Sequence, residues 1–364
     1  MANIMSLPVE IVQRMAYETG VLEPKDVLSL ALSNKEVYAL VLGPLGSENV
    51  FDRDQHRALG GVLFCAERGW WGAALLATER GVGDVEERPA GEGVYRTPFT
   101  LACQGGKVRM VKALMRRGVE PKGYNLVLAC MFGAPEVVVT LLEDGRVDPG
   151  WNGGSPILAA VKAGFIHVIR LLLEDERVDP AVDNNGAIRL AAQHGRTEVV
   201  QVLLGDARVD PAADNDYALG AASDGGHVDV VRLLLEDDRV NPGANNDYAF
   251  RFAAEGGHAD IVQLLLADAR VDPAADNDYA IGAAAEGGHV GVVRLLLADA
   301  RVNPGSNGDY AIFLAAHNGH ADVVRLLLAD DRVNPAAGQG RPIRFASQNN
   351  HTDIVQLLSQ HSPP

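Results

Sequence analysis

The sequence predicts an all-α solenoid built from stacked helix pairs, and two observations carry that prediction. One pattern recurs every 31 residues, as shown by its tyrosines at Tyr217, Tyr248, Tyr279 and Tyr310. Each copy also holds two short apolar stretches with helical spacing, separated by glycine. A fixed period of this length indicates repeats that bury their apolar faces only against their neighbours.

One repeat can be read physically, starting at Asp216. The small alanines at 221–222 lie in a first short helix, and the glycines at 225–226 end it because glycine accepts the left-handed conformation. The valines and leucines of 230–235 give a second helix a broad apolar face. Pro242 cannot continue a helix, so an extended loop follows. Asp216 is expected to cap the first helix at its N-terminus.

The segment from Thr97 to Ala102 reads Thr-Pro-Phe-Thr-Leu-Ala, which resembles the Thr-Pro-Leu-His-x-Ala start of an ankyrin repeat. Five glycines fall at that family's position between the helices: Gly195, Gly226, Gly257, Gly288 and Gly319. The resemblance covers residues 56–361 and implies about nine or ten repeats, the first of them degenerate. The repeat is shorter than the family's usual length of about 33 residues, and Tyr-Ala replaces Thr-Pro in four copies and Gly-Ala at 186–187 in another. These departures predict a shortened loop finger and a recast helix start.

Residues 1–45 do not share the repeat and predict three helices of their own. They open with Leu-Pro-Val-Glu-Ile at 7–11, continue with Asp-Val-Leu-Ser-Leu at 26–30 and close near Tyr38. This order resembles an F-box, the three-helix unit that docks the Skp-type adaptor of cullin–RING ubiquitin ligases. The resemblance implies that seven residues lie at the adaptor interface: Leu7, Pro8, Glu10, Ile11, Leu28, Leu30 and Tyr38.

Two features of this region depart from the F-box pattern. The stretch 17–24 is longer than usual, and Tyr38 stands nearest the position of the usual Trp. The alternative is a plain helical cap on the array, because the terminal repeats of a solenoid need a cap. Residues 46–55 form a connector, and the glycine- and glutamate-rich 82–96 is expected to be a mobile loop. Between them, Trp70 and Trp71 either pack on the N-terminal unit or form a docking patch, and packing is favoured.

Composition and charge limit the partners of the chain. Its 364 residues are 47% hydrophobic and carry a net charge of −16, which opposes nucleic acid and anionic membrane as partners. Cys65, Cys103 and Cys130 form no disulfide framework and predict reduced core thiols. No signal peptide or long apolar run is visible, so we expect a cytoplasmic or nuclear protein. We also expect the chain to be a monomer on its own.

A second period lies on top of the first. The nine residues from Asp210 to Ala218 recur word for word from Asp272 to Ala280, which is two repeats later. Gly220 and Gly282 match within this longer period, whereas other residue types stand there in the intervening copies. Alternate repeats are therefore expected to present different surfaces.

Histidine and arginine each form a ladder along the repeats. The histidines at 227, 258, 289, 320 and 351 stand too far apart for a shared metal ion, because packed helices are about 8–10 Å apart and Zn–N bonds are about 2.0–2.1 Å. The resemblance to ankyrin repeats, in which a Gly-His pair stands at this turn, implies that each histidine makes a hydrogen bond there. The arginines at 146, 177, 208, 239, 270, 301 and 332 stand beside acids, which predicts a row of surface ion pairs.

The repeated tyrosines are interpreted as packing between neighbouring repeats, with the hydroxyl in water. In the ankyrin family the fingers and first helices form the binding groove. Positions of the first helix that vary between repeats are therefore the target-binding candidates: Arg189, Asp224, Arg251, Glu255, Glu286, Phe313, His317 and Arg344. If the acids among them share one groove, its field would favour a basic segment; the alternative is that they only solvate the array.

No catalytic, metal or cofactor signature is present, so neither an enzyme nor a cofactor is expected. Together the two resemblances imply the substrate-recognition subunit of a ubiquitin ligase, in which the N-terminal unit holds the Skp-type adaptor and the array holds an unknown protein target. The alternative is an ankyrin scaffold whose N-terminal helices only cap the array.

Overall fold

The computed structural model describes residues 75, 78 and 97–361. Within them the chain forms 18 α-helices and no β-strand, which confirms the all-α prediction for this part of the chain. The chain divides into two compact units, residues 1–179 and 180–364. The predicted F-box-like unit, the connector, Trp70, Trp71 and the 82–96 loop lie outside the described residues.

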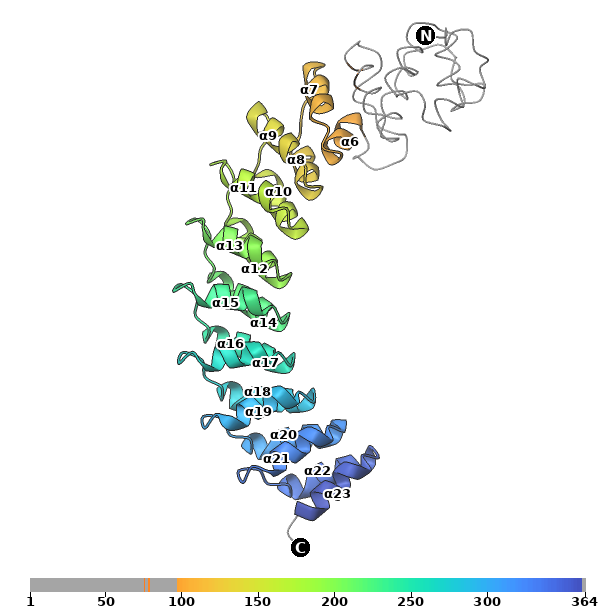
Figure 1. The fold of residues 1–364 in the computed structure, drawn as a ribbon, viewed down its shortest axis with the longest axis vertical. Helices are drawn as coiled ribbons and strands as arrows, with labels where there is room; N and C mark the ends of the chain where they lie inside the picture. The colour runs from red at the N-terminus through yellow and green to blue at the C-terminus, as the bar shows by residue number, and fades with distance from the viewer. Residues whose placement is uncertain (1–74, 76–77, 79–96, 362–364) are drawn as a thin grey trace, which may run out of the picture. The chain divides into compact units, whose positions relative to one another are not determined.

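The helices come in pairs (Figure 1). In the first compact unit they are α6 (Pro98–Gln104), α7 (Val108–Arg116), α8 (Gly123–Met131), α9 (Pro135–Asp144), α10 (Trp151–Ala163) and α11 (Ile166–Leu173). In the second they are α12 (Val182–Gln193), α13 (Thr197–Leu204), α14 (Ala213–Asp224), α15 (Val228–Leu235), α16 (Ala244–Glu255), α17 (Ala259–Leu266), α18 (Ala275–Glu286), α19 (Val290–Ala298), α20 (Ser306–Asn318), α21 (Ala321–Leu328), α22 (Ala337–Gln348) and α23 (Thr352–His361). Each even-numbered helix is the first helix of a repeat, and each odd-numbered helix is the second.

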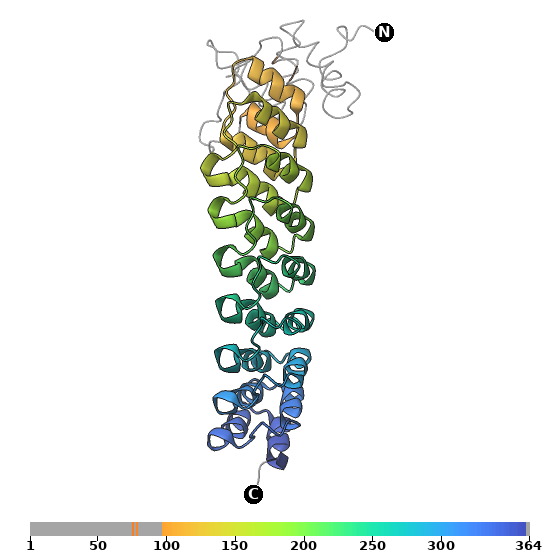
Figure 2. The same ribbon diagram turned by 90° about the vertical axis from the view of Figure 1, so that its left-hand side faces the viewer.

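The second compact unit is a stack of two helical layers, and Figure 2 shows its helices end-on in two columns. First helices pack on first helices, as α14 does on α12 and α16, and second helices pack on second helices, as α15 does on α13 and α17. The core between the layers joins small and large side chains: Ala222 of α14 and Val231 and Leu234 of α15 are fully buried. The alanines of the first helix and the branched residues of the second helix, both predicted from sequence, therefore meet in one core, which also buries larger first-helix residues such as Leu219 and Phe250.

A glycine follows each first helix from α6 to α20, as the sequence predicts, whereas Asn350 with a φ of 64° takes this place after α22. Gly226 and Gly257 have φ values of 70° and 76°, in the left-handed region that glycine adopts without strain. A second constraint acts at Gly257, where an added Cβ would lie 2.5 Å from Nδ1 of His289 in the next repeat. Both the backbone conformation and the neighbouring ring therefore require glycine here.

The histidine ladder makes hydrogen bonds, as predicted, but the partner lies in the preceding repeat. Nε2 of His289 is 2.9 Å from the carbonyl oxygen of Glu255 and donates its proton to it. The same bond joins His227 to Gln193, His258 to Asp224, His320 to Glu286 and His351 to His317. Each histidine thus satisfies a carbonyl at the end of the preceding first helix and couples neighbouring repeats.

The predicted arginine row of surface ion pairs is also confirmed. Arg239 pairs with Asp237 at 2.7 Å and lowers the pKa of this carboxyl through their side-chain hydrogen bond. Its second nitrogen donates to the carbonyl oxygen of Val209 in the preceding repeat, at 2.7 Å. The charge pair stabilises the fold above the unfolded-state pKa of Asp, about 3.9, and its contribution is lost as the pH falls through the lowered pKa. Because the pair is exposed, the attraction between its charges contributes only about 0–1 kcal/mol to the free energy of unfolding. The hydrogen bond from Arg239 to Val209 adds a link between neighbouring repeats.

Candidate functional site

Each first helix from α10 onward begins with a turn of three left-handed residues. In α18 these are Asp276, Asn277 and Asp278, with φ values of 56°, 58° and 57°. Asp and Asn tolerate this conformation better than other residues with a Cβ, which explains why they recur here. In α6, by contrast, Thr97 caps the helix by accepting a hydrogen bond from the backbone nitrogen of Thr100. The left-handed turn is the recast helix start of the shortened repeat.

Asp216 does not cap its own helix, which corrects the N-cap prediction. Its φ of 59° is left-handed, whereas an N-cap residue is extended. Its carboxylate instead accepts a hydrogen bond from the backbone nitrogen of Asn241, at 2.8 Å, in the loop of the next repeat. The same bond joins Asn185 to Asp210, Asp247 to Asp272, Asp278 to Asn303 and Asp309 to Asn334. The third turn residue therefore links successive loops.

Burial raises the pKa of three of these carboxyls, Asp216, Asp247 and Asp309. Because the pKa of each of these carboxyls is raised in the folded state, its ionisation equilibrium favours folding below the unfolded-state pKa of Asp, about 3.9. This contribution to stability decreases as the pH rises through the folded-state pKa. Asn185 makes the same bond without a charge. The buried third residue in each of these turns therefore holds a loop in place, whereas the first two residues of the turn, such as Asp214 and Asn215, are exposed.

The two-repeat period has a structural cause. Arg189 pairs with Asp214 of the next repeat at 2.8 Å and lies over the ring of Tyr217, with 5.4 Å from its guanidinium carbon to the ring centroid. Two repeats on, Arg251 does the same with Asp276, at 2.7 Å, and with Tyr279, at 5.4 Å. In the alternate interfaces glycine replaces the arginine, and Asn245 and Asn307 replace the aspartate. The two residue types change together because they face each other.

The structure places the predicted target-binding residues in two groups. Arg189 and Arg251 are partly buried and are held by the contacts just described. Asp224, Glu255 and Glu286 are exposed at the ends of their first helices, and Glu255 accepts a hydrogen bond from the hydroxyl of Tyr279 at 2.9 Å. We use the name first-helix face for the surface formed by these acids, the left-handed turns and the four repeated tyrosines.

The remaining candidates gather near the last repeat. Phe313 stacks on His317, with ring centroids 5.9 Å apart, and meets Phe345 edge-on at 5.3 Å. Arg344, which is exposed, lies over Phe345. These four side chains therefore form one aromatic and basic cluster, distinct from the acidic part of the first-helix face.

Three of the repeated tyrosines are more open than the packing interpretation predicts. Tyr217, Tyr279 and Tyr310 are 36%, 38% and 42% exposed, whereas Tyr248 is half-buried. Exposed aromatic rings are frequent anchors at protein interfaces, because they bring a large contact area at a low entropic cost. Sequence reasoning left these rings out of the candidate list, although the two-repeat period already singled out the glycines beside them.

No group of three or more His, Cys, Asp or Glu side chains in residues 97–361 is placed to hold a metal ion. Burial raises the pKa of the Cys103 and Cys130 thiols, as predicted for core cysteines, and Cys65 lies outside the described residues. None of the helices described has both the length and the apolar character needed to span a bilayer.

The adaptor-binding candidates Leu7, Pro8, Glu10, Ile11, Leu28, Leu30 and Tyr38 all lie outside the described residues. Comparison with known families finds ankyrin repeats (3 copies) at residues 126–215, 188–277 and 281–363, and it detects no F-box. None of the curated proteins compared with the chain matches it. The family matches cover more than half of the 364 residues and span the helix pairs from α10 onward, with the histidine ladder described above. The chain therefore belongs to the ankyrin-repeat family, whose members are generally interaction modules that bind other proteins.

Proposed function

We propose that this chain is the substrate-recognition subunit of an SCF-type cullin–RING ubiquitin ligase. The array binds a target protein through its first-helix face, and residues 1–45 hold the Skp-type adaptor. The observation that carries target binding is the combination of exposed tyrosine rings and exposed carboxylates on one face of stacked ankyrin repeats. Such a chain catalyses nothing itself and acts by bringing a target close to an enzyme.

The adaptor-binding half of the proposal is supported by the residues at the N-terminus alone. The Leu-Pro-x-Glu-Ile pattern at 7–11 and the three expected helices resemble an F-box. A second candidate function is an ankyrin scaffold whose N-terminal helices only cap the array. It is favoured by the family comparison, which detects ankyrin repeats and no F-box.

We expect the double variant Leu7→Ala with Pro8→Ala to abolish capture of a purified Skp-type adaptor by the full chain. Both residues open the proposed docking unit, and truncating an interface anchor typically costs about 2 kcal/mol or more of binding free energy. The measurement is a pull-down with wild-type and variant protein, together with urea unfolding to show that the array keeps its stability.

A matched control removes the same two residue types outside the docking pattern. Pro44→Ala with Leu45→Ala should leave adaptor capture unchanged. Absence of adaptor binding by the wild-type chain would contradict the ligase proposal and favour the ankyrin scaffold.

A further inference from the structure

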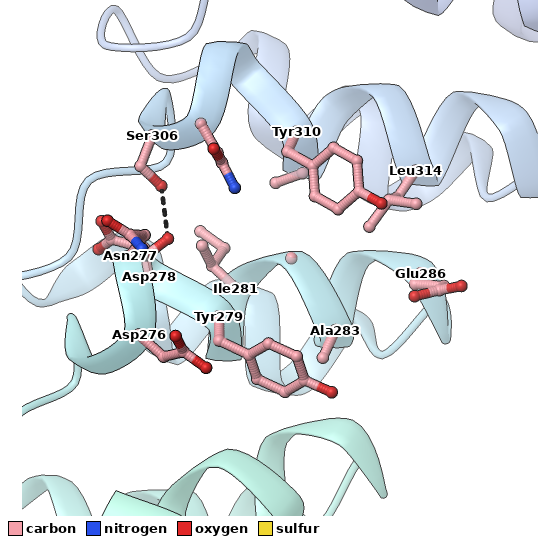
Figure 3. Close-up of a pocket in the computed structure, with 13 residues that line it drawn as sticks. Asp276, Asn277, Asp278, Tyr279, Ile281, Ala283, Glu286, Ser306, Tyr310 and Leu314 are labelled. Carbon is pink, nitrogen blue, oxygen red and sulfur yellow. Dashed lines mark hydrogen bonds between the residues drawn. The ribbon is translucent and has the colours of Figure 1, made fainter. Parts of the chain in front are cut away.

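A pocket of about 100 Å³ opens on the first-helix face between α18 and α20 (Figure 3). It lies at Gly282, where an added Cβ would meet only Cδ1 of Tyr310, at 3.8 Å. At the equivalent Gly220, the ring of Tyr248 already occupies the space that a Cβ would need. Of these two glycine positions, one is therefore filled by its neighbour and the other is open.

The difference between the two positions follows from the neighbours of the tyrosine. Tyr248 packs on Phe252 one helical turn later, with ring centroids 4.2 Å apart. Leu314 replaces that phenylalanine in α20, and Tyr310 instead has Phe313 as its aromatic neighbour, at 5.7 Å. The ring of Tyr310 therefore leaves Gly282 uncovered.

The lining of the pocket combines aromatic rings with negative charge. Tyr310 provides an open ring, Leu314 adds apolar surface, and Glu286 is an exposed carboxylate among the lining side chains. Tyr279 and Asp276 also line the pocket, but Arg251 of this chain already lies over that ring and pairs with that carboxylate at 2.7 Å. No lysine, arginine or histidine lines it. Carboxylates and the faces of aromatic rings both attract cations, so the pocket suits a positively charged group on an apolar stem.

The chain itself shows how such a group sits at this position. Arg251 occupies the residue equivalent to Gly282 one repeat earlier, and its guanidinium lies over Tyr279 and against Asp276. At Gly282 the chain supplies no arginine, while the ring of Tyr310 remains in place and exposed. An arginine from another molecule would find the same kind of ring, with Glu286 as an exposed carboxylate nearby.

We propose that the pocket at Gly282 binds an arginine side chain presented by a segment of a partner protein. The guanidinium stacks on Tyr310 and is attracted by Glu286, and its alkyl stem covers Gly282 and Leu314. Arginine is the expected residue because its planar, weakly hydrated head stacks on aromatic rings better than an ammonium does. The inference rests on the proposed function in one respect, since it assumes that the first-helix face is a protein-binding surface.

The full chain labelled with 3-fluorotyrosine provides the test, with the signals of Tyr279 and Tyr310 assigned through Tyr→Phe variants. The probe is the peptide acetyl-Ala-Arg-Ala-amide, compared with its citrulline and lysine analogues. We expect a saturable ¹⁹F shift of both signals with the arginine peptide, and binding about three- to tenfold weaker with the neutral citrulline peptide. Equal binding of the citrulline or the lysine peptide would overturn the proposal.

Two variants and one control locate the binding. Gly282→Leu should abolish the shift by filling the pocket, and the fold accepts a long side chain there because Arg251 occupies the equivalent position. Glu286→Gln should weaken binding about three- to tenfold. Asp224→Asn removes one charge at the equivalent position beside the filled Gly220, and should leave binding unchanged.

If the arginine peptide still bound to Gly282→Leu, or if Asp224→Asn and Glu286→Gln weakened its binding equally, the proposal that the pocket at Gly282 binds arginine would be overturned. Because this test uses a purified chain and a peptide, its failure leaves protein binding elsewhere on the face intact. Failure of adaptor capture by the wild-type chain, conversely, says nothing against the pocket.

Discussion

Leu234→Ala is expected to lower the free energy of unfolding by about 2–5 kcal/mol, the usual cost of truncating a fully buried leucine. Leu234 lies in α15 with no exposed surface, and its helix packs on the second helices of both neighbouring repeats. Because repeats are stabilised through their interfaces, hydrogen exchange should also accelerate in α13 and α17. Urea unfolding measures the loss, and hydrogen exchange measures its spread.

The adjacent Leu233 provides the matched control. It is only partly buried, so Leu233→Ala should cost clearly less than Leu234→Ala. Unchanged exchange in both flanking repeats, with the full loss of stability confined to α14 and α15, would contradict a stack held together by neighbour contacts.

Gly257→Ala is expected to destabilise the chain through two separate effects. A residue with a Cβ pays about 1–2 kcal/mol for the left-handed conformation at φ 76°. The new methyl group would also lie 2.5 Å from Nδ1 of His289, so the ring must move and its bond to Glu255 is lost, at about 0.5–1.5 kcal/mol. The sum, about 1.5–3.5 kcal/mol, is measured by urea unfolding.

Gly308→Ala isolates the first of these effects. Gly308 has a similar φ of 71°, but an added Cβ would meet nothing within 4 Å. This control should show the conformational cost alone. Equal losses in the two variants would show that the histidine bond contributes nothing to coupling between repeats.

Much of the repeat could be predicted from its sequence because its signals are local. The apolar spacing of 230–235 fixes the buried side of the second helix, and the left-handed glycine at 226 ends the first helix. The Arg239–Asp237 pair is only two residues apart in the chain, so it too could be read directly. Features that depend on residues within one repeat could therefore be predicted from the sequence.

Features that depend on two repeats at once were harder to predict. Asp216 reads locally as an N-cap, and its true partner, Asn241, lies 25 residues away. The open pocket at Gly282 depends on how Tyr310 packs, and that in turn depends on whether Leu or Phe stands one turn later. The two-repeat period pointed to these positions, but only packing between neighbouring repeats distinguishes the filled glycine position from the open one.

We propose the first-helix face as the surface by which this chain recognises a protein. Site-specific photo-crosslinking tests it most directly, with p-benzoylphenylalanine in place of Asp224 on this face or in place of Arg232, an exposed residue of α15 in the same repeat. We expect one defined protein to crosslink from position 224 and not from position 232. Crosslinking of that protein from position 232 alone would contradict the claim.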